Sequence, residues 1–336
     1  MEKRILIDEK VFYSDALFFF VFGLSACGPE ENIPSSDSTQ SDLPTNVSER
    51  HYVGFTDQKN NRIVVYDLDV EDWSSEEALV WEFKGRFVAG AGFKFRSSEF
   101  WGGDVVIACG SGVGIIDFAT KDILWSTSFV PNNPHSVELL PNGNIVCAGS
   151  TGNTIRIYGS SQKKSNCSSF DVEFADAHGL LWDPELEVLW AIGLNQLSAF
   201  AVGGTDAEPE LYLIENMTYR LPSSGGHDLT PVYGDTDRLW CTTNTRVYQF
   251  VKSTGKFVTD FVGGSTLDRA AVKGIGNFYD KRVVYVFPNE NLYEWTTDRV
   301  NYFDVSENGK RVCASGYREN VSDAYYKVRV WISDYQ

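Results

Sequence analysis

The sequence predicts an all-β protein, a β-propeller. Six blades are favoured, and seven blades are the alternative. The first observation is composition: 22 Phe, 16 Tyr and 9 Trp against 2 Met favour strands over helices. The second is residues 134–148, where two apolar runs flank Asn142-Gly143, a strong signal for a β-hairpin. The third is repetition, because His135, His178 and His227 each precede a strand and lie 43 and 49 residues apart. Units of about 40–50 residues with several short strands are typical of propeller blades.

The predicted strands fall into six units along the chain. The first unit contains 52–55, 63–67 and 79–83, and the second contains 93–95, 105–109, 114–118 and 123–125. His135 opens the third unit, which continues with 154–158 and 170–174, and His178 and His227 open the fourth and fifth. The sixth begins at Lys273 and contains 283–287 and 292–295. Each blade has two apolar faces, and packing the blades in a ring buries both.

The two ends of the repeat region predict how the ring closes. The first unit lacks an inner strand, because its first run matches the second strand of the other units. Residues 326–331 near the C terminus can supply that strand and close the ring. Residues 306–314 repeat the pattern of 140–148. They predict the outer edge of the sixth blade or, as the alternative, a seventh blade.

The N-terminal segment has the pattern of an export signal. Residues 16–26 form an apolar run of 11 residues behind Lys3 and Arg4. This run is too short to span a bilayer, which takes about 20 residues. It ends in Leu24-Ser25-Ala26-Cys27, which resembles the lipobox of bacterial lipoproteins, where the signal is removed before a cysteine that carries lipid.

This resemblance implies a signal peptide over 1–26, a lipidated Cys27 with a flexible tether over 27–49, and a single propeller domain over 50–336. The tether is expected because residues 28–48 are mostly polar or proline, with almost nothing to bury. The resemblance also implies a location at the bacterial cell envelope, where lipid would attach the protein to the outer membrane. The folded domain would face the periplasm or the cell surface.

Charge and cysteine spacing argue against several classes of binding partner. The net charge of -17 argues against nucleic acid, because its phosphates would be repelled. It also argues against an anionic membrane surface, so contact with a membrane is expected through the lipid anchor alone. The six cysteines show no spacing typical of zinc sites. The chain is expected to be a monomer.

Four side chains are the candidates for chemistry. His135, His178, His227 and Lys273 occupy the same position in four successive units, just ahead of the first strand. In a propeller this strand lines the central channel. The four side chains are therefore predicted to gather at one mouth of the channel, as candidate catalytic residues.

Three interpretations of these histidines stay open. Neutral imidazoles on neighbouring walls can hold Zn or Mn as a cofactor, which makes all three histidines candidate metal ligands. Without a metal, one histidine acts as general base while Lys273, with Lys94 or Arg96, holds a carboxylate. In the third interpretation each histidine caps its blade through a hydrogen bond to the backbone. Asp176 and Asp228 flank two of the histidines, and each either orients an imidazole or starts a turn.

Resemblances to known families extend this prediction to function. The histidine positions resemble the inward-facing histidine sites of propeller polysaccharide lyases such as oligogalacturonate lyase. Residues 117–125 resemble the repeats of quinoprotein-type propellers, which bears on the fold and implies no quinone. The chain as a whole resembles lipoprotein propellers of the Bacteroidetes type.

These resemblances imply a propeller that binds or cleaves a carbohydrate, such as a uronate-containing glycan, at a histidine-lined channel mouth. An enzyme of this kind would be a polysaccharide lyase or a glycoside hydrolase. The alternative is a non-catalytic propeller that binds a ligand or a protein and whose histidines are structural.

Overall fold

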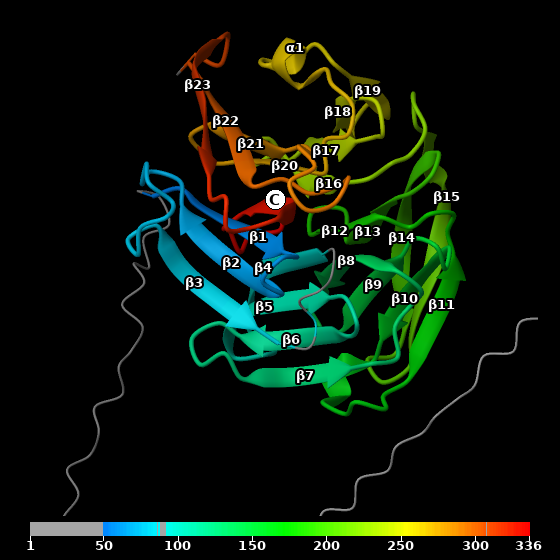
Figure 1. The fold of residues 1–336 in the computed structure, drawn as a ribbon. Coiled ribbons are helices and arrows are strands. Elements are labelled where there is room, and N and C mark those ends of the chain that lie inside the picture. Colours follow the sequence, from blue (N-terminus) through cyan, green and yellow to red (C-terminus); the bar gives the residue numbers. More distant parts are fainter. Residues whose placement is uncertain (1–49, 86, 88–91, 307) are drawn as a thin grey trace, which may run out of the picture. The chain divides into compact units, whose positions relative to one another are not determined.

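The computed structural model describes residues 50–85, 87, 92–306 and 308–336. The predicted signal peptide, Cys27 and tether lie outside these residues. Within them the chain forms six four-stranded antiparallel sheets, arranged as the blades of a β-propeller (Figure 1). The prediction of an all-β propeller is confirmed with six blades, and the described residues form no seventh.

Each of the first three blades has four strands, which follow one another from the channel outwards. Blade 1 contains β24 (Tyr325–Val330), β1 (Tyr52–Asp57), β2 (Arg62–Asp67) and β3 (Leu79–Lys84). Blade 2 contains β4 (Gly92–Ser98), β5 (Gly103–Cys109), β6 (Val113–Asp117) and β7 (Ile123–Thr127). Blade 3 contains β8 (Pro134–Leu139), β9 (Ile145–Gly149), β10 (Thr154–Tyr158) and β11 (Ser169–Glu173).

The other three blades follow the same order. Blade 4 contains β12 (Gly179–Asp183), β13 (Val188–Ile192), β14 (Gln196–Gly204) and β15 (Pro209–Arg220). Blade 5 contains β16 (Leu229–Pro231), β17 (Arg238–Thr242), β18 (Val247–Val251) and β19 (Lys256–Val258). Blade 6 contains β20 (Gly274–Asn277), β21 (Val283–Val286), β22 (Arg299–Val305) and β23 (Val312–Glu319). The short helices η1 (Ser160–Gln162) and α1 (Gly264–Leu267) lie in loops.

The apolar core is divided among the six junctions between neighbouring blades, and one cluster of buried residues fills each junction. Strand β5 shows why the sequence folds this way. Val106 and Ala108 pack towards blade 1, whereas Val105, Ile107 and Cys109 pack towards blade 3. Successive side chains of a strand point to opposite faces. A strand that is apolar at every position therefore needs a neighbouring blade on each side.

Ring closure occurs as predicted. The C-terminal strand β24 pairs antiparallel with β1, and Val53 lies opposite Val330 (Figure 1). The six inner strands β24, β4, β8, β12, β16 and β20 contact one another in ring order around the channel. Blade 1 therefore combines the last strand of the chain with the first strands of the described region.

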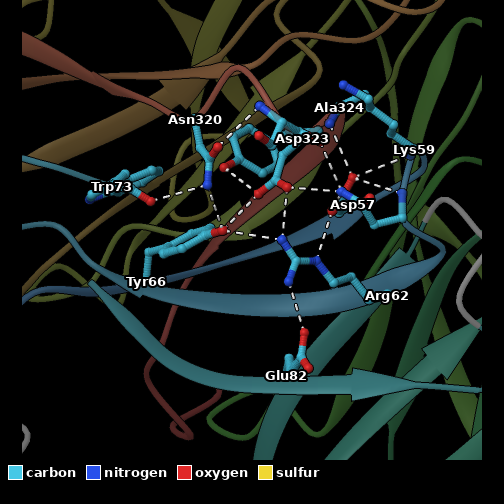
Figure 2. A network of polar contacts seen from close by, with 12 residues as sticks. Asp57, Lys59, Arg62, Tyr66, Trp73, Glu82, Asn320, Asp323 and Ala324 are labelled. Carbon is cyan, nitrogen blue, oxygen red and sulfur yellow. Dashed lines mark hydrogen bonds and ion pairs between the residues drawn. The ribbon is translucent and has the colours of Figure 1, made fainter. Parts of the chain in front are cut away.

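A polar clasp joins the two ends where β24 begins. Arg62 donates from Nε to Asp57 (2.8 Å), and from its terminal nitrogens to Asp323 (2.7 Å) and Glu82 (2.8 Å). Figure 2 shows the guanidinium between the two aspartates. Asp323 also accepts the Tyr66 hydroxyl at 2.7 Å, and burial raises the pKa of Asp323. Both aspartates are buried, so the clasp depends on the charge of Arg62.

One predicted strand is wrong. Residues 292–295 lie in the loop between β21 and β22, and the third strand of blade 6 is β22. Leu292, Tyr293 and Trp295 are exposed, so this run has no face to bury although its residue types favour strands. Residues 312–319 form β23 and pair with β22, which confirms the prediction of an outer edge for blade 6. Among the described helices, none has the length and apolar character needed to cross a membrane.

Candidate functional site

The structure brings the four predicted side chains to one mouth of the channel. His135 lies in β8, and His178, His227 and Lys273 immediately precede or lead into β12, β16 and β20. The imidazole centroids of His135 and His178 are 4.1 Å apart, and those of His178 and His227 are 4.5 Å apart. Three walls of the propeller therefore contribute to one continuous imidazole cluster.

The cluster lines a cavity of about 750 Å³, which lies within the range of about 300–1,000 Å³ typical of small-molecule sites. Other lining residues come from different blades and include Asp176, Asn244, Tyr293, Trp295 and Tyr326. The cavity thus combines imidazoles, one ammonium, one carboxylate, three side-chain amides and aromatic rings.

Two of the histidines are fixed by the chain just before them. His135 Nδ1 lies 2.8 Å from the Asn133 carbonyl oxygen. His178 Nδ1 lies 3.3 Å from the carbonyl oxygen of Asp176 and 3.1 Å from its carboxylate. A carbonyl accepts only a donor, so these contacts place a proton on Nδ1 and leave Nε2 as an acceptor. Backbone capping therefore does occur at His135 and His178. It orients each ring through Nδ1 and leaves Nε2 available to a ligand.

His227 is held differently. Its Nε2 lies 3.0 Å from Lys273 Nζ and 3.3 Å from the Tyr326 hydroxyl. Its Nδ1 is buried and has no hydrogen-bond partner among the described residues. Lys273 has no carboxylate partner within ion-pair distance in the described chain, and its Nζ faces the cavity that the histidines line. Lys273 is therefore a cation available to a ligand.

Lys327 lies beneath the imidazoles and was not among the predicted site residues. Its ammonium is fully buried and donates to the carbonyl oxygens of His135 (3.2 Å), His178 (3.4 Å) and His227 (3.4 Å). One side chain of the closing strand therefore ties together the three walls that carry the histidines. Burial lowers the pKa of Lys327 to about 8.

A column of buried charges continues from Lys327 along the channel. Asp228 contacts Lys327 at 3.4 Å and Arg329 at 2.7 Å. Asp228 therefore neither orients an imidazole nor simply starts a turn. The burial of Asp228 opposes its ionisation, but Arg329 and Lys327 outweigh this and lower its pKa.

The second carboxylate of the column is Glu138. It accepts from Lys94 at 2.6 Å and from Arg96 at 2.9 Å and 3.0 Å. These two cations overcome the desolvation of Glu138 and lower its pKa to about 2. The hypothesis that Lys94 or Arg96 holds a ligand carboxylate is wrong, because both are buried and hold Glu138 instead.

The electrostatic result is a cationic channel in an acidic protein. The column combines four cationic side chains with two carboxylates, each carboxylate lying between two cations. Burial, aided by the charge of Lys327, lowers the pKa of His135 to about 3, and burial also lowers the pKa of His227. These two imidazoles are neutral at neutral pH. Lys273 and Lys327 supply positive charge next to the cavity.

This arrangement does not fit the predicted Zn or Mn site. No group of three or more His, Cys, Asp or Glu side chains in the described regions is placed to hold a metal ion. The Lys273 ammonium lies 3.0 Å from His227 Nε2, where a metal ion bound to this nitrogen would have to lie. The metal-free interpretation fits the side chains better, and metal binding itself stays a prediction.

The structure also selects one tryptophan for the site. Trp182, Trp190 and Trp240 are buried in the core, whereas Trp295 lines the cavity and is 44% exposed. Its ring stacks on Tyr293 with centroids 5.1 Å apart. The sequence alone could not single out Trp295, because all of these residues have strand-like spacing.

The family model for DUF6528 matches residues 10–298, most of the chain. The chain belongs to this family. DUF6528 is described as a family of unknown function. No curated protein sequence matches the chain significantly.

Solved structures share the fold of this DUF6528 protein. A Bacteroides fragilis protein named a "putative 6-phosphogluconolactonase" has a TM-score of 0.54 at 14% identity, covering 83% of this chain and 84% of its own. A Lactobacillus plantarum protein has a TM-score of 0.55 at 12% identity, covering 83% and 99%. A Bacteroides caccae protein of unknown function has a TM-score of 0.53 at 11% identity, covering 83% and 98%. At these identities the similarity concerns the fold alone.

Proposed function

We propose that this DUF6528 protein binds a carboxylate-bearing sugar, such as a unit of a uronate-containing glycan, at the histidine-lined mouth. The observation that carries the proposal is the pairing of neutral imidazoles with Lys273 in one 750 Å³ cavity. A neutral imidazole exchanges hydrogen bonds with sugar hydroxyls, and an ammonium pairs with a carboxylate. The predicted lipid anchor at Cys27 would hold this site at the cell envelope.

The buried column favours an anionic ligand over a neutral one. Lys327 lies directly beneath the imidazoles, and its charge is only partly balanced by Asp228, which Arg329 also shares. Low-dielectric walls focus such a field into a cleft. Asp176 contributes the one carboxylate of the lining, and it is paired with His178. A ligand carboxylate therefore meets an excess of positive charge at Lys273.

Calorimetric titration with sodium D-galacturonate tests this binding. Replacing Lys273 with Met keeps the length of the side chain and removes its charge, so we expect the affinity to fall by about tenfold or more, equivalent to about 1.4 kcal/mol. The matched control is Lys256→Met on the exposed edge of β19, which should leave the affinity unchanged. Equal binding of galacturonate by the protein and by Lys273→Met, or equally strong binding of neutral galactose, contradicts the proposal.

A second candidate function is β-elimination at the same site, and the contact between His178 and Asp176 favours it. Asp176 orients His178, whose Nε2 can take the proton next to the sugar carboxylate while Lys273 stabilises the charge that develops. The pair of electrons forms a carbon–carbon double bond, and the departing glycosidic oxygen takes a proton from the Tyr326 hydroxyl. An unsaturated product from trigalacturonate, detected by its ultraviolet absorbance and lost in His178→Ala, distinguishes turnover from binding alone.

A further inference from the structure

We propose that the loop of residues 287–298 is a stacking platform for a second sugar ring, so that the ligand is an oligosaccharide and not a single uronate. This inference rests on the proposed function, because the platform lies beside the side chains assigned to the carboxylate. It adds a subsite and a minimum ligand size to that assignment.

The length of this loop sets blade 6 apart. It joins the second and third strands of its blade at the histidine end of the channel and contains twelve residues. The equivalent connections in the other five blades contain three or four residues, namely 58–61, 110–112, 150–153, 193–195 and 243–246. Three of the short connections line the cavity through one residue each, Gln58, Gly110 and Asn244, whereas the connection in blade 6 adds two aromatic side chains, Tyr293 and Trp295.

The two aromatic rings of the loop form one slab. Tyr293 and Trp295 are 45% and 44% exposed, and their planes are 19° apart. A stacked pair shields the two inner ring faces and leaves the outer faces free. The apolar face of a pyranose is a natural partner for such a surface, because stacking removes apolar area from water while the hydroxyls at the rim stay hydrated.

The platform is held rigidly against the charged part of the site. Trp295 Nε1 donates to Gln58 Oε1 at 2.9 Å, which spans the junction of blades 6 and 1. Asn291 donates to the Asp323 carbonyl at 2.7 Å, and Thr297 and Tyr325 exchange two backbone hydrogen bonds. The next residue of the chain is Tyr326, which contacts His227.

The loop and the imidazole cluster are therefore attached to the same few residues at the start of β24. A platform fixed in this way loses little conformational freedom when it binds a ring. A glycan whose charged unit lies at Lys273 can place its neighbouring unit on the slab.

Tryptophan fluorescence reports on this subsite directly. Of the nine tryptophans, all in the described part of the chain, Trp295 is 44% exposed and the other eight are at most 8% exposed. A sugar that stacks on the slab should change the emission of Trp295 and leave that of the buried tryptophans almost unchanged.

The experiment compares D-galacturonate with trigalacturonate by calorimetry and fluorescence. We expect trigalacturonate to bind the protein at least about tenfold more tightly, a gain of about 1.4 kcal/mol. Trp295→Ala should remove this gain and the fluorescence change, and lower the affinity for trigalacturonate much more than the affinity for galacturonate. Trp295→Phe, which keeps a ring, should retain most of the gain. Tyr212→Ala, which removes an exposed aromatic ring from β15, is the matched control and should change nothing.

The outcomes distinguish a failure of the stacking platform from a failure of the proposed galacturonate binding. Equal affinity for the two ligands, or an equal loss for both in Trp295→Ala, overturns the platform while galacturonate binding at Lys273 stands. If neither acidic sugar binds to the protein, both the assignment of the charged site and the platform are overturned. The thermal midpoint of each variant shows whether it is folded, and the exposed positions of the two rings predict that it is.

Discussion

Replacing Arg62 with Met should lower the free energy of unfolding by about 3–5 kcal/mol, the usual cost of removing one partner from a buried ion pair. Arg62 pairs with Asp57 and Asp323, whose side chains are 0% and 1% exposed. Without the guanidinium, two carboxylates face each other in the clasp that joins β1 to β24. The loss should shrink as the pH falls, because burial raises the pKa of Asp323 and protonation of Asp323 relieves the repulsion.

Urea denaturation of Arg62→Met against the unmodified protein measures this effect. Arg246→Met is the matched control, because Arg246 and its partner Asp268 are both exposed, and exposed pairs contribute about 0–1 kcal/mol. Digestion of the C-terminal strand by a protease should also be faster in Arg62→Met. A loss no larger than that of the control would show that the clasp does not hold the ring closed.

Replacing Glu138 with Gln should destabilise the channel by a similar amount, about 3–5 kcal/mol. Glu138 is fully buried and is the carboxylate partner of both Lys94 and Arg96. Glutamine keeps the shape and one acceptor oxygen but leaves two buried cations without a counter-charge. Lys94 can respond by losing its proton, since burial already lowers its pKa to about 8.

The effect of Glu138→Gln should therefore depend on pH. Glu138 itself holds up the pKa of Lys94, so in the variant this pKa falls further and the amine loses its proton below about pH 8. The loss should therefore be larger at about pH 5, where Lys94 is still charged, than at about pH 8. Glu319→Gln, which breaks the exposed pair with Arg299, should cost about 0–1 kcal/mol at either pH. A Glu138→Gln loss that is small, or that does not vary with pH, would mean that the column is not an ionic network in solution.

Much of the fold follows from local patterns that the sequence displays. The runs around Asn142-Gly143 and the regular positions of the three histidines define blades, because each blade is one hydrogen-bonded unit with a fixed order of strands. The closing role of β24 could also be predicted, since the first unit lacked an inner strand. Residues 292–295 were misassigned because their residue types favour a strand, while the decision depends on whether a neighbouring blade covers them.

The polar interior of the site was harder to predict. Lys327 and Arg329, like Lys94 and Arg96, alternate with apolar residues in inner strands, which indicates that they share a face. That face points into the channel, where Asp228 and Glu138 pair with residues 101 and 42–44 positions away. Such pairing exists only in the closed ring. The local sequence shows the alternation of charged and apolar residues but not which charges will pair.

The most direct test of the proposed site uses the four histidines of the chain as reporters. His135, His178 and His227 line the cavity, whereas His51 precedes β1 and contacts Asp69 and Asp280 away from it. Imidazole NMR signals, assigned with single His→Asn variants, are recorded during titration with D-galacturonate at neutral pH, with galactose as the control. The account predicts that the three cavity signals shift and that His51 does not. Unchanged signals for the three cavity histidines, or a shift confined to His51, would contradict it.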